Sequence, residues 1–136
     1  MVIWVVLAIF LPLLVEAKSL KDVSIRISTD IIKDCSYIGD SVKGCYYSPS
    51  KGSRATIYLS AYLNIQEIRV AFLHEIGHYL MDGTSEETYN KLFGSAFGYY
   101  VKKEYIQEYA TNAFVYWWIT NKATQAQDKF FINLFR

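Results

Sequence analysis

An excess of charge of either sign is missing from this chain of 136 residues. The 14 basic and 13 acidic residues leave a formal net charge of +1. Binding to a phosphate backbone depends on a basic surface, so the composition argues against a nucleic-acid partner. Runs of like charge are also lacking, which argues against a charged tail. Hydrophobic residues make up 52% of the chain, enough for a packed core and too many for a disordered chain.

The apolar N-terminal stretch, residues 2–15, has no basic residue before it and is shorter than the roughly twenty residues that span a bilayer. It is similar to the hydrophobic region of a secretory signal, and Val15-Glu16-Ala17 fits the small-residue pattern before a cleavage site. We therefore predict a signal peptide over residues 1–17. An uncleaved membrane anchor at residues 2–15 and a buried helix remain as alternatives. The signal peptide and the anchor both imply a secreted or extracytoplasmic protein.

Cysteine is scarce, with only Cys35 and Cys45 in the chain. They do not form the close Cys-x-x-Cys pair of a cysteine-based metal site. In an exported chain they meet an oxidising environment, and the short loop between them contains two glycines. We predict one disulfide between them, stabilising the fold by roughly 2–3 kcal/mol.

Internal repeats and Pro/Gly-rich linkers are absent after the N-terminal stretch, so residues 18–136 are expected to form one domain and a monomer. The first half predicts strands. Residues 23–28 and 54–60 alternate apolar and polar side chains, and residues 44–47 form a shorter candidate. Turn-forming residues at 48–53 predict a hairpin between the second and third of these strands.

The second half predicts helices, so the fold class is α+β. Asn64 and Glu67 form a capping box for a helix that ends at Asp82-Gly83. Its apolar stripe consists of Ile65, Ile68, Phe72, Ile76 and Leu80. Further helices are expected over residues 84–93, with Thr84 and Glu87 as a second capping box, and over residues 99–120 and 124–135. Within the helix over residues 99–120, Phe114, Tyr116, Trp117 and Trp118 are expected to pack in the core, with a substrate pocket as the alternative role.

The chain has only two histidines, His74 and His78, and both belong to the sequence His74-Glu75-Ile76-Gly77-His78. Residues four apart lie above each other on a helix, so both imidazoles can reach one metal ion. Glu75, about a quarter turn round the helix, is placed to reach a water at that metal. This H-E-x-x-H pattern predicts a zinc site with Glu75 as a catalytic base.

The segment Phe72–Leu80 resembles the active-site helix of the zincin metalloproteases. The resemblance implies a small twisted N-terminal β-sheet, an edge strand lining the substrate cleft, the active-site helix and then C-terminal helices. It places the strand over residues 54–60 at that edge, where it would pair with an extended peptide. It also implies that residues 18–136 form a zincin-like metallopeptidase domain acting on a peptide or protein.

Two histidines leave zinc one ligand short, and no third histidine exists for the metzincin pattern. Residues 108–114 resemble the gluzincin arrangement and the E-x-x-x-N-x-F signature of ImmA/IrrE-type peptidases. By that resemblance Glu108 is the third ligand and Asn112 orients a metal-binding histidine. Three carboxylates remain as rivals for the ligand position. Glu104 lies one helical turn earlier, while Glu86 and Glu87 belong to a segment similar to the aspzincin Gly-Thr-x-x-Asp motif.

The expected function is therefore zinc-dependent hydrolysis of peptide bonds, with His74, His78 and Glu108 as ligands and Glu75 as general base. Related gluzincins often add a hydrogen-bond donor for the oxyanion, and the candidates are Tyr105, Tyr109 and Tyr116. The alternatives are a catalytically inactive, zinc-stabilised binding module and a membrane-anchored peptidase that cuts one partner.

Overall fold

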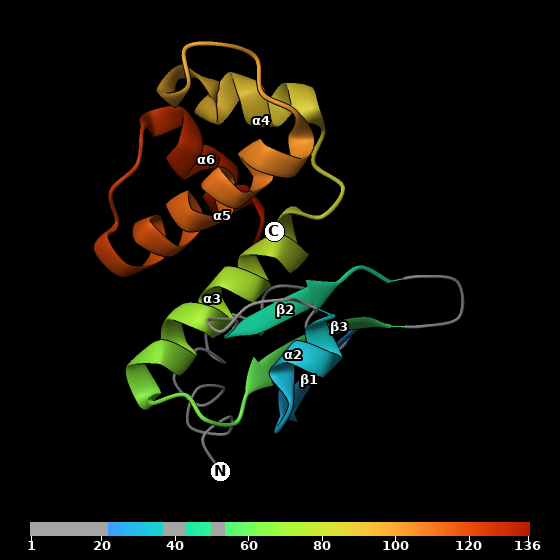
Figure 1. Cartoon of the computed structure of the whole chain (residues 1–136). Coiled ribbons are helices and arrows are strands. Elements are labelled where there is room, and N and C mark those ends of the chain that lie inside the picture. Colours follow the sequence, from blue (N-terminus) through green and yellow to red (C-terminus); the bar gives the residue numbers. More distant parts are fainter. Residues whose placement is uncertain (1–21, 37–42, 50–53) are drawn as a thin grey trace.

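The computed structural model describes residues 22–36, 43–49 and 54–136. It has an α+β architecture in which a three-stranded sheet is followed by helices (Figure 1). In chain order the elements are β1 (Val23–Ser28), α2 (Ile31–Cys35), β2 (Gly44–Tyr47), β3 (Ala55–Ser60), α3 (Ile65–Met81), α4 (Glu86–Phe93), the 3-10 turn η2 (Gly94–Ala96), α5 (Lys103–Thr120) and α6 (Gln125–Asn133). The predicted signal or anchor segment lies outside the described residues.

The sheet has the strand order β1-β3-β2. β2 and β3 are antiparallel, with Tyr46 opposite Ile57, which confirms the predicted pairing of these strands. β1 runs parallel to the other side of β3, with Ile25 opposite Ile57. The prediction that residues 54–60 form the edge strand is therefore wrong. β3 is central, and β2 is an edge strand.

Helix α3 lies between the sheet and the group formed by α4, α5 and α6 (Figure 1). Its start is as predicted, because the Asn64 side chain accepts a hydrogen bond from the backbone of Glu67 and the Glu67 side chain accepts one in return. Gly83 takes a positive φ of 88° just after the helix, as expected. The predicted apolar stripe is wrong at its first position, because Ile65 is 55% exposed.

Two local predictions need correction, and one short helix was missed. Helix α4 is capped by Ser85, whose hydroxyl accepts from the backbone of Thr88, rather than by Thr84. Helix α5 begins at Lys103 instead of near Tyr99. The short helix α2 was not predicted; Asp30 caps it by accepting from the backbone of Lys33.

The core lies on both sides of α3, which packs against β2 and β3 on one side and against α5 on the other, and it continues between α4, α5 and α6. Its largest fully buried side chains include Phe72, Phe93, Phe114 and Phe131. Trp117 and Trp118 pack against this cluster, as expected, but Tyr116 is 54% exposed. This packing fixes α5 against α3, and both helices contribute to the site described below.

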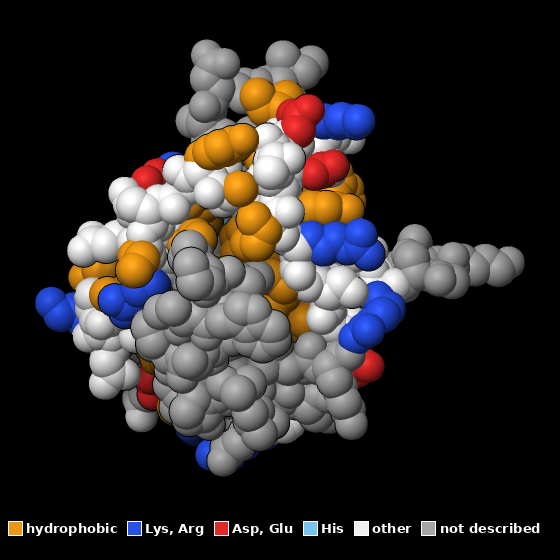
Figure 2. All heavy atoms as spheres, turned by 90° about the horizontal axis from the view of Figure 1, so that it is seen from below, with side chains coloured by type: hydrophobic (Ala, Val, Ile, Leu, Met, Phe, Trp, Pro, Cys, Tyr) orange, Lys and Arg blue, Asp and Glu red, His pale blue; other side chains and the backbone are white. Residues whose placement is uncertain are grey.

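The predicted disulfide joins Cys35 at the end of α2 to Cys45 in β2, with a Cα–Cα distance of 5.8 Å. A structural disulfide suggests an oxidising, extracytoplasmic environment. No helix of the described part of the chain is both long and apolar enough to cross a membrane. On the face in Figure 2, basic and acidic side chains of the described residues are mixed among apolar and neutral ones.

Candidate metal centre

Helix α3 places His74 and His78 one turn apart on the same face. Their Nε2 atoms are 3.1 Å apart, and the two rings meet nearly at right angles with centroids separated by 4.7 Å. Both side chains are partly buried, with exposed fractions of 23% and 16%. The i, i+4 spacing thus brings the two ring nitrogens to one point, as the sequence predicts.

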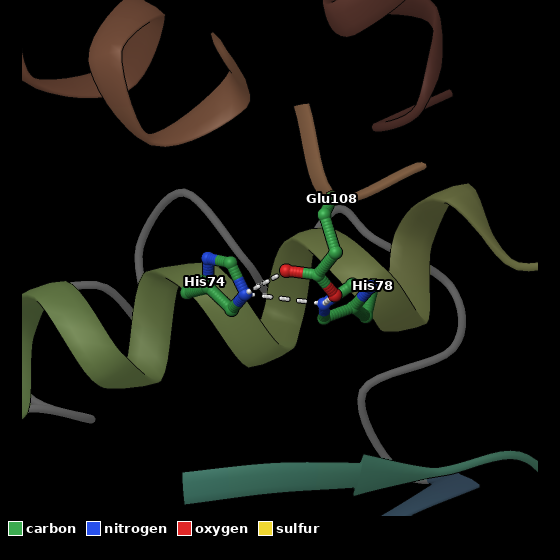
Figure 3. A group of neighbouring side chains, drawn as sticks. All are labelled: His74, His78 and Glu108. Atoms are coloured by element: carbon green, nitrogen blue, oxygen red, sulfur yellow. Dashed lines mark hydrogen bonds and ion pairs between the residues drawn. The ribbon is translucent and has the colours of Figure 1, made fainter. Parts of the chain in front are cut away.

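Helix α5 brings Glu108 to the same point (Figure 3). Its Oε2 is 3.2 Å from Nε2 of His74, and its Oε1 is 2.8 Å from Nε2 of His78. Ligands about 2.1 Å from a tetrahedral zinc ion lie about 3.4 Å from one another. The three donor groups would need to separate by only a few tenths of an ångström to surround such an ion. His74, His78 and Glu108 therefore form a group that could hold a metal ion.

The rival carboxylates lie elsewhere. Oε2 of Glu86 accepts a hydrogen bond of 2.7 Å from the backbone nitrogen of Lys103 at the start of α5. Glu87 and Glu104 do not line the cavity that contains the two histidines. Within the described residues, the group with suitable metal-binding geometry contains Glu108 and none of the other three.

The close approach of α3 and α5 depends on Gly77. A Cβ atom at this position would lie 2.9 Å from Cδ1 of Phe114 and 3.1 Å from Cγ2 of Thr111. Contacts of this length are shorter than packed carbon atoms tolerate. Glycine between the two histidines therefore lets α5 approach closely enough for Glu108 to reach both rings.

Thr111 contacts the far side of the His78 ring. Its hydroxyl oxygen is 3.3 Å from Nδ1 of His78, and its hydroxyl donates a hydrogen bond of 2.7 Å to the carbonyl of Gln107. The single hydroxyl proton is used in the second bond, so the oxygen accepts from Nδ1–H of His78. In a neutral His78 the lone pair then lies on Nε2, the nitrogen that faces Glu108 and that would bind a metal ion. This role of Thr111 was missed in the sequence, where the residue is part of an ordinary helical segment.

The surroundings of His74 raise its pKa, and the predicted partner Asn112 is the smallest of the contributing groups. Burial alone lowers that pKa, but the hydrogen bond with Glu108 and the charge of Glu75 outweigh it. The two histidine contacts in turn hold the pKa of Glu108 well below its usual range. The carboxylate of Glu108 is therefore negatively charged and faces the two imidazoles, an arrangement that suits a bound cation.

Glu75 is 6% exposed and lines the same cavity without belonging to the metal-binding group. Burial raises the pKa of its carboxyl group; the histidine rings partly offset this, while the charge of Glu108 adds to it. None of the hydrogen bonds and ion pairs among the described residues involves the carboxylate of Glu75. The group is therefore available to a molecule in the cavity.

The cavity has a volume of about 390 Å³ and is bounded on one side by β2. Tyr46 of this strand stacks parallel to the ring of His78, with centroids 6.5 Å apart, and its hydroxyl donates to Asp82 at 2.7 Å. Burial and this hydrogen bond raise the pKa of Tyr46, so it remains a neutral phenol. No local sequence signal distinguished Tyr46 from the other eleven tyrosines of the 12 in the chain.

The tyrosines expected to serve as oxyanion donors lie outside this cavity. Tyr105 and Tyr116 are 64% and 54% exposed, and the ring of Tyr109 packs against Phe93 and Phe97. The prediction is wrong because these residues lie on other faces of α5 than the one that carries Glu108. Among the described tyrosines, Tyr46 is the one whose ring stacks on His78.

In comparisons with known proteins, no family model, no curated protein and no solved structure matches this chain. The candidate function is therefore argued from the motif residues and from the geometry of the cavity.

Proposed function

We propose that this protein is a zinc-dependent peptidase of the zincin type. His74, His78 and Glu108 hold the metal, and Glu75 acts as general base. The observation that carries the proposal is the convergence of two imidazole nitrogens and one carboxylate within 3.2 Å of one another, beside a buried carboxylate that is not a ligand.

The donor set favours zinc and a catalytic role. Imidazole and carboxylate are ordinary zinc ligands, whereas structural zinc sites are closed by four protein ligands. Three protein ligands leave one coordination position for water or substrate. When bound, zinc supplies Lewis acidity, which lowers the pKa of water to about 7 and polarises a carbonyl group.

The position of Glu75 supports proton transfer. Its carboxylate lines the cavity without a protein donor among the described residues, so it is free to accept a proton from the attacking water and deliver it to the leaving amine. Its raised pKa suits both steps, since an efficient general base has a pKa nearer to neutral pH. A non-catalytic binding module would have no need of a buried acid at this position.

Strand β2 supplies a place for a peptide. Among the strands of the described residues it pairs only with β3, and it borders the cavity with Gly44, Cys45 and Tyr46. An extended peptide that paired with its free backbone edge would pass over the metal ligands. β2 therefore takes the role that the zincin resemblance gave to residues 54–60.

The test is the substitution Glu75→Gln, which preserves shape and removes the base. The zinc-loaded variant is expected to retain its metal and to cleave a peptide mixture about 100- to 10,000-fold more slowly than the unaltered chain. Glu104→Gln is the control, because this helix carboxylate is exposed and lies outside the cavity. Mass spectrometry of the products and metal analysis give both readouts. Equal cleavage by Glu75→Gln would rule out the proposed mechanism.

A further inference from the structure

One residue in the lining of the cavity has a positively charged side chain that plays no part in the proposed chemistry. Lys103, the first residue of α5, lines it together with the metal-binding residues. It is the one lysine or arginine among the described residues that line this cavity. A positive charge in the lining of the cavity is suited to select among substrates.

The ammonium group of Lys103 has no protein partner in the described part of the chain. The backbone nitrogen of Lys103 donates to Glu86, but its side chain forms no ion pair. The nearby carboxylate of Asp82 instead accepts the hydroxyl of Tyr46. The charge of Lys103 is therefore available for an anion that enters the cavity.

Gln107 lies one helical turn after Lys103 and lines the same cavity. Residues four apart on a helix are neighbours on its surface, so the ammonium group of Lys103 and the amide of Gln107 can bind one group together. The side-chain amide of Gln107 forms no hydrogen bond with the described residues. Lys103 and Gln107 thus offer donors of the kind that bind a carboxylate.

The spacing along α5 indicates where that carboxylate would lie on a substrate. Lys103 and Glu108 are five residues apart, which is about 7.5 Å along a helix axis. An extended peptide advances about 3.3 Å per residue. For an extended peptide that runs along α5, a carboxylate held by Lys103 would therefore lie about two residues from the peptide bond at the metal.

We propose that Lys103, assisted by Gln107, binds a carboxylate of the peptide substrate about two residues from the cleaved bond. This inference rests on the proposed peptidase function. Two groups of a peptide supply such a carboxylate, its C-terminus and an acidic side chain. A C-terminal carboxylate would make the protein release dipeptides, and an acidic side chain would make it an endopeptidase with an acidic preference.

The experiment measures binding, so it does not depend on turnover. The zinc-loaded Glu75→Gln chain is titrated into three fluorescein-labelled alanine pentapeptides at low salt, with fluorescence anisotropy as readout. The first peptide has a free C-terminal carboxylate, the second has a C-terminal amide, and the third has the amide and a glutamate at its last position. Whichever carboxylate peptide binds better identifies the source.

At least one carboxylate peptide is expected to bind about tenfold more tightly than the uncharged amide, as a charge-assisted hydrogen bond allows. The additional substitution Lys103→Gln should remove this preference, and Lys103→Glu should reverse it. Lys102→Gln is the matched control, because this neighbouring lysine does not line the cavity and should leave the preference intact. Equal binding of all three peptides, no binding, or a preference that survives Lys103→Gln overturns the inference.

Cleavage by the unaltered chain separates this inference from the proposed function. If the chain hydrolyses a peptide mixture but binds the three probes equally, the peptidase function stands and carboxylate recognition fails. If it prefers carboxylate peptides but hydrolyses nothing, recognition stands and the peptidase function fails.

Discussion

Thr111 holds His78 from the side opposite the metal position, with its hydroxyl oxygen 3.3 Å from Nδ1 of the ring. The proton of the same hydroxyl is donated to the carbonyl of Gln107 within α5. Both the tautomer and the orientation of His78 are therefore set by a residue one turn away from Glu108 on the same helix. The two helices thus form the candidate site together, with Thr111 of α5 holding His78 of α3.

The substitution Thr111→Val tests this relationship, because it keeps the shape of the side chain and removes the hydroxyl. Zinc affinity is expected to fall about 10- to 100-fold, as is typical when the partner of a metal-binding histidine is lost. Competition with a chromogenic chelator measures the dissociation constant. Thr111→Ser keeps the hydroxyl and should retain most of the affinity. Equal losses in the two variants would show that the methyl packing matters and the hydrogen bond does not.

Gly77→Ala tests the close approach of the helices. The new methyl group would meet Phe114 and Thr111 at 2.9 and 3.1 Å and force α5 away from α3. We expect a loss of about 1–3 kcal/mol in the free energy of unfolding, as for other overpacked sites. Because Glu108 moves with α5, zinc affinity should fall as well. Urea denaturation and the chelator assay measure the two effects.

Gly94→Ala is the matched control for this substitution. Gly94 has a right-handed helical conformation with φ of −65°, and a Cβ atom there would have its nearest contact at 3.4 Å, with Oδ1 of Asn90. Its stability should be unchanged or slightly increased, since alanine restricts the unfolded chain more than glycine does. If Gly77→Ala behaved like Gly94→Ala, the packing argument would be wrong.

Helix α3 and the convergence of its two histidines could be predicted from the sequence because the signals are local. The capping pair Asn64 and Glu67 and the histidine spacing all act within a few residues. The disulfide was predictable for the same reason, since Cys35 and Cys45 are separated by only 10 positions in the sequence. Glu108 was chosen only through family resemblance, and the structure brings it to both histidines.

The remaining features depend on contacts between distant segments. The central place of β3 follows from its parallel pairing with β1, which leaves no mark on the apolar alternation of either strand. The neighbours of a helical side chain depend on which face packs inward. The periodicity of α5 therefore did not show that Thr111 contacts His78 while Tyr109 packs against Phe93. Tyr46 and Lys103 line the cavity because β2 and the first turn of α5 converge on α3. Such convergence is a property of tertiary packing.

The disulfide has a predicted energetic role. Its loop spans a sequence separation of 10, so Cys35→Ser together with Cys45→Ser should lower the free energy of unfolding by about 2–3 kcal/mol. Urea denaturation of the variant, and of the unaltered chain with and without a reductant, measures this. Cys45 also lines the cavity, so peptide binding should weaken along with stability. Identical midpoints with and without the reductant would show that the cysteines are not paired.

The metal content of the purified chain and of Glu108→Ala tests the central claim most directly. The unaltered chain should bind about one zinc ion, as three protein ligands and an open position predict. Glu104→Ala, which removes an exposed carboxylate one turn away, should bind the same amount. Glu108→Ala should lose most of its zinc, because two imidazoles alone hold the ion weakly. Full zinc occupancy in Glu108→Ala, or no zinc in the unaltered chain, would contradict the account.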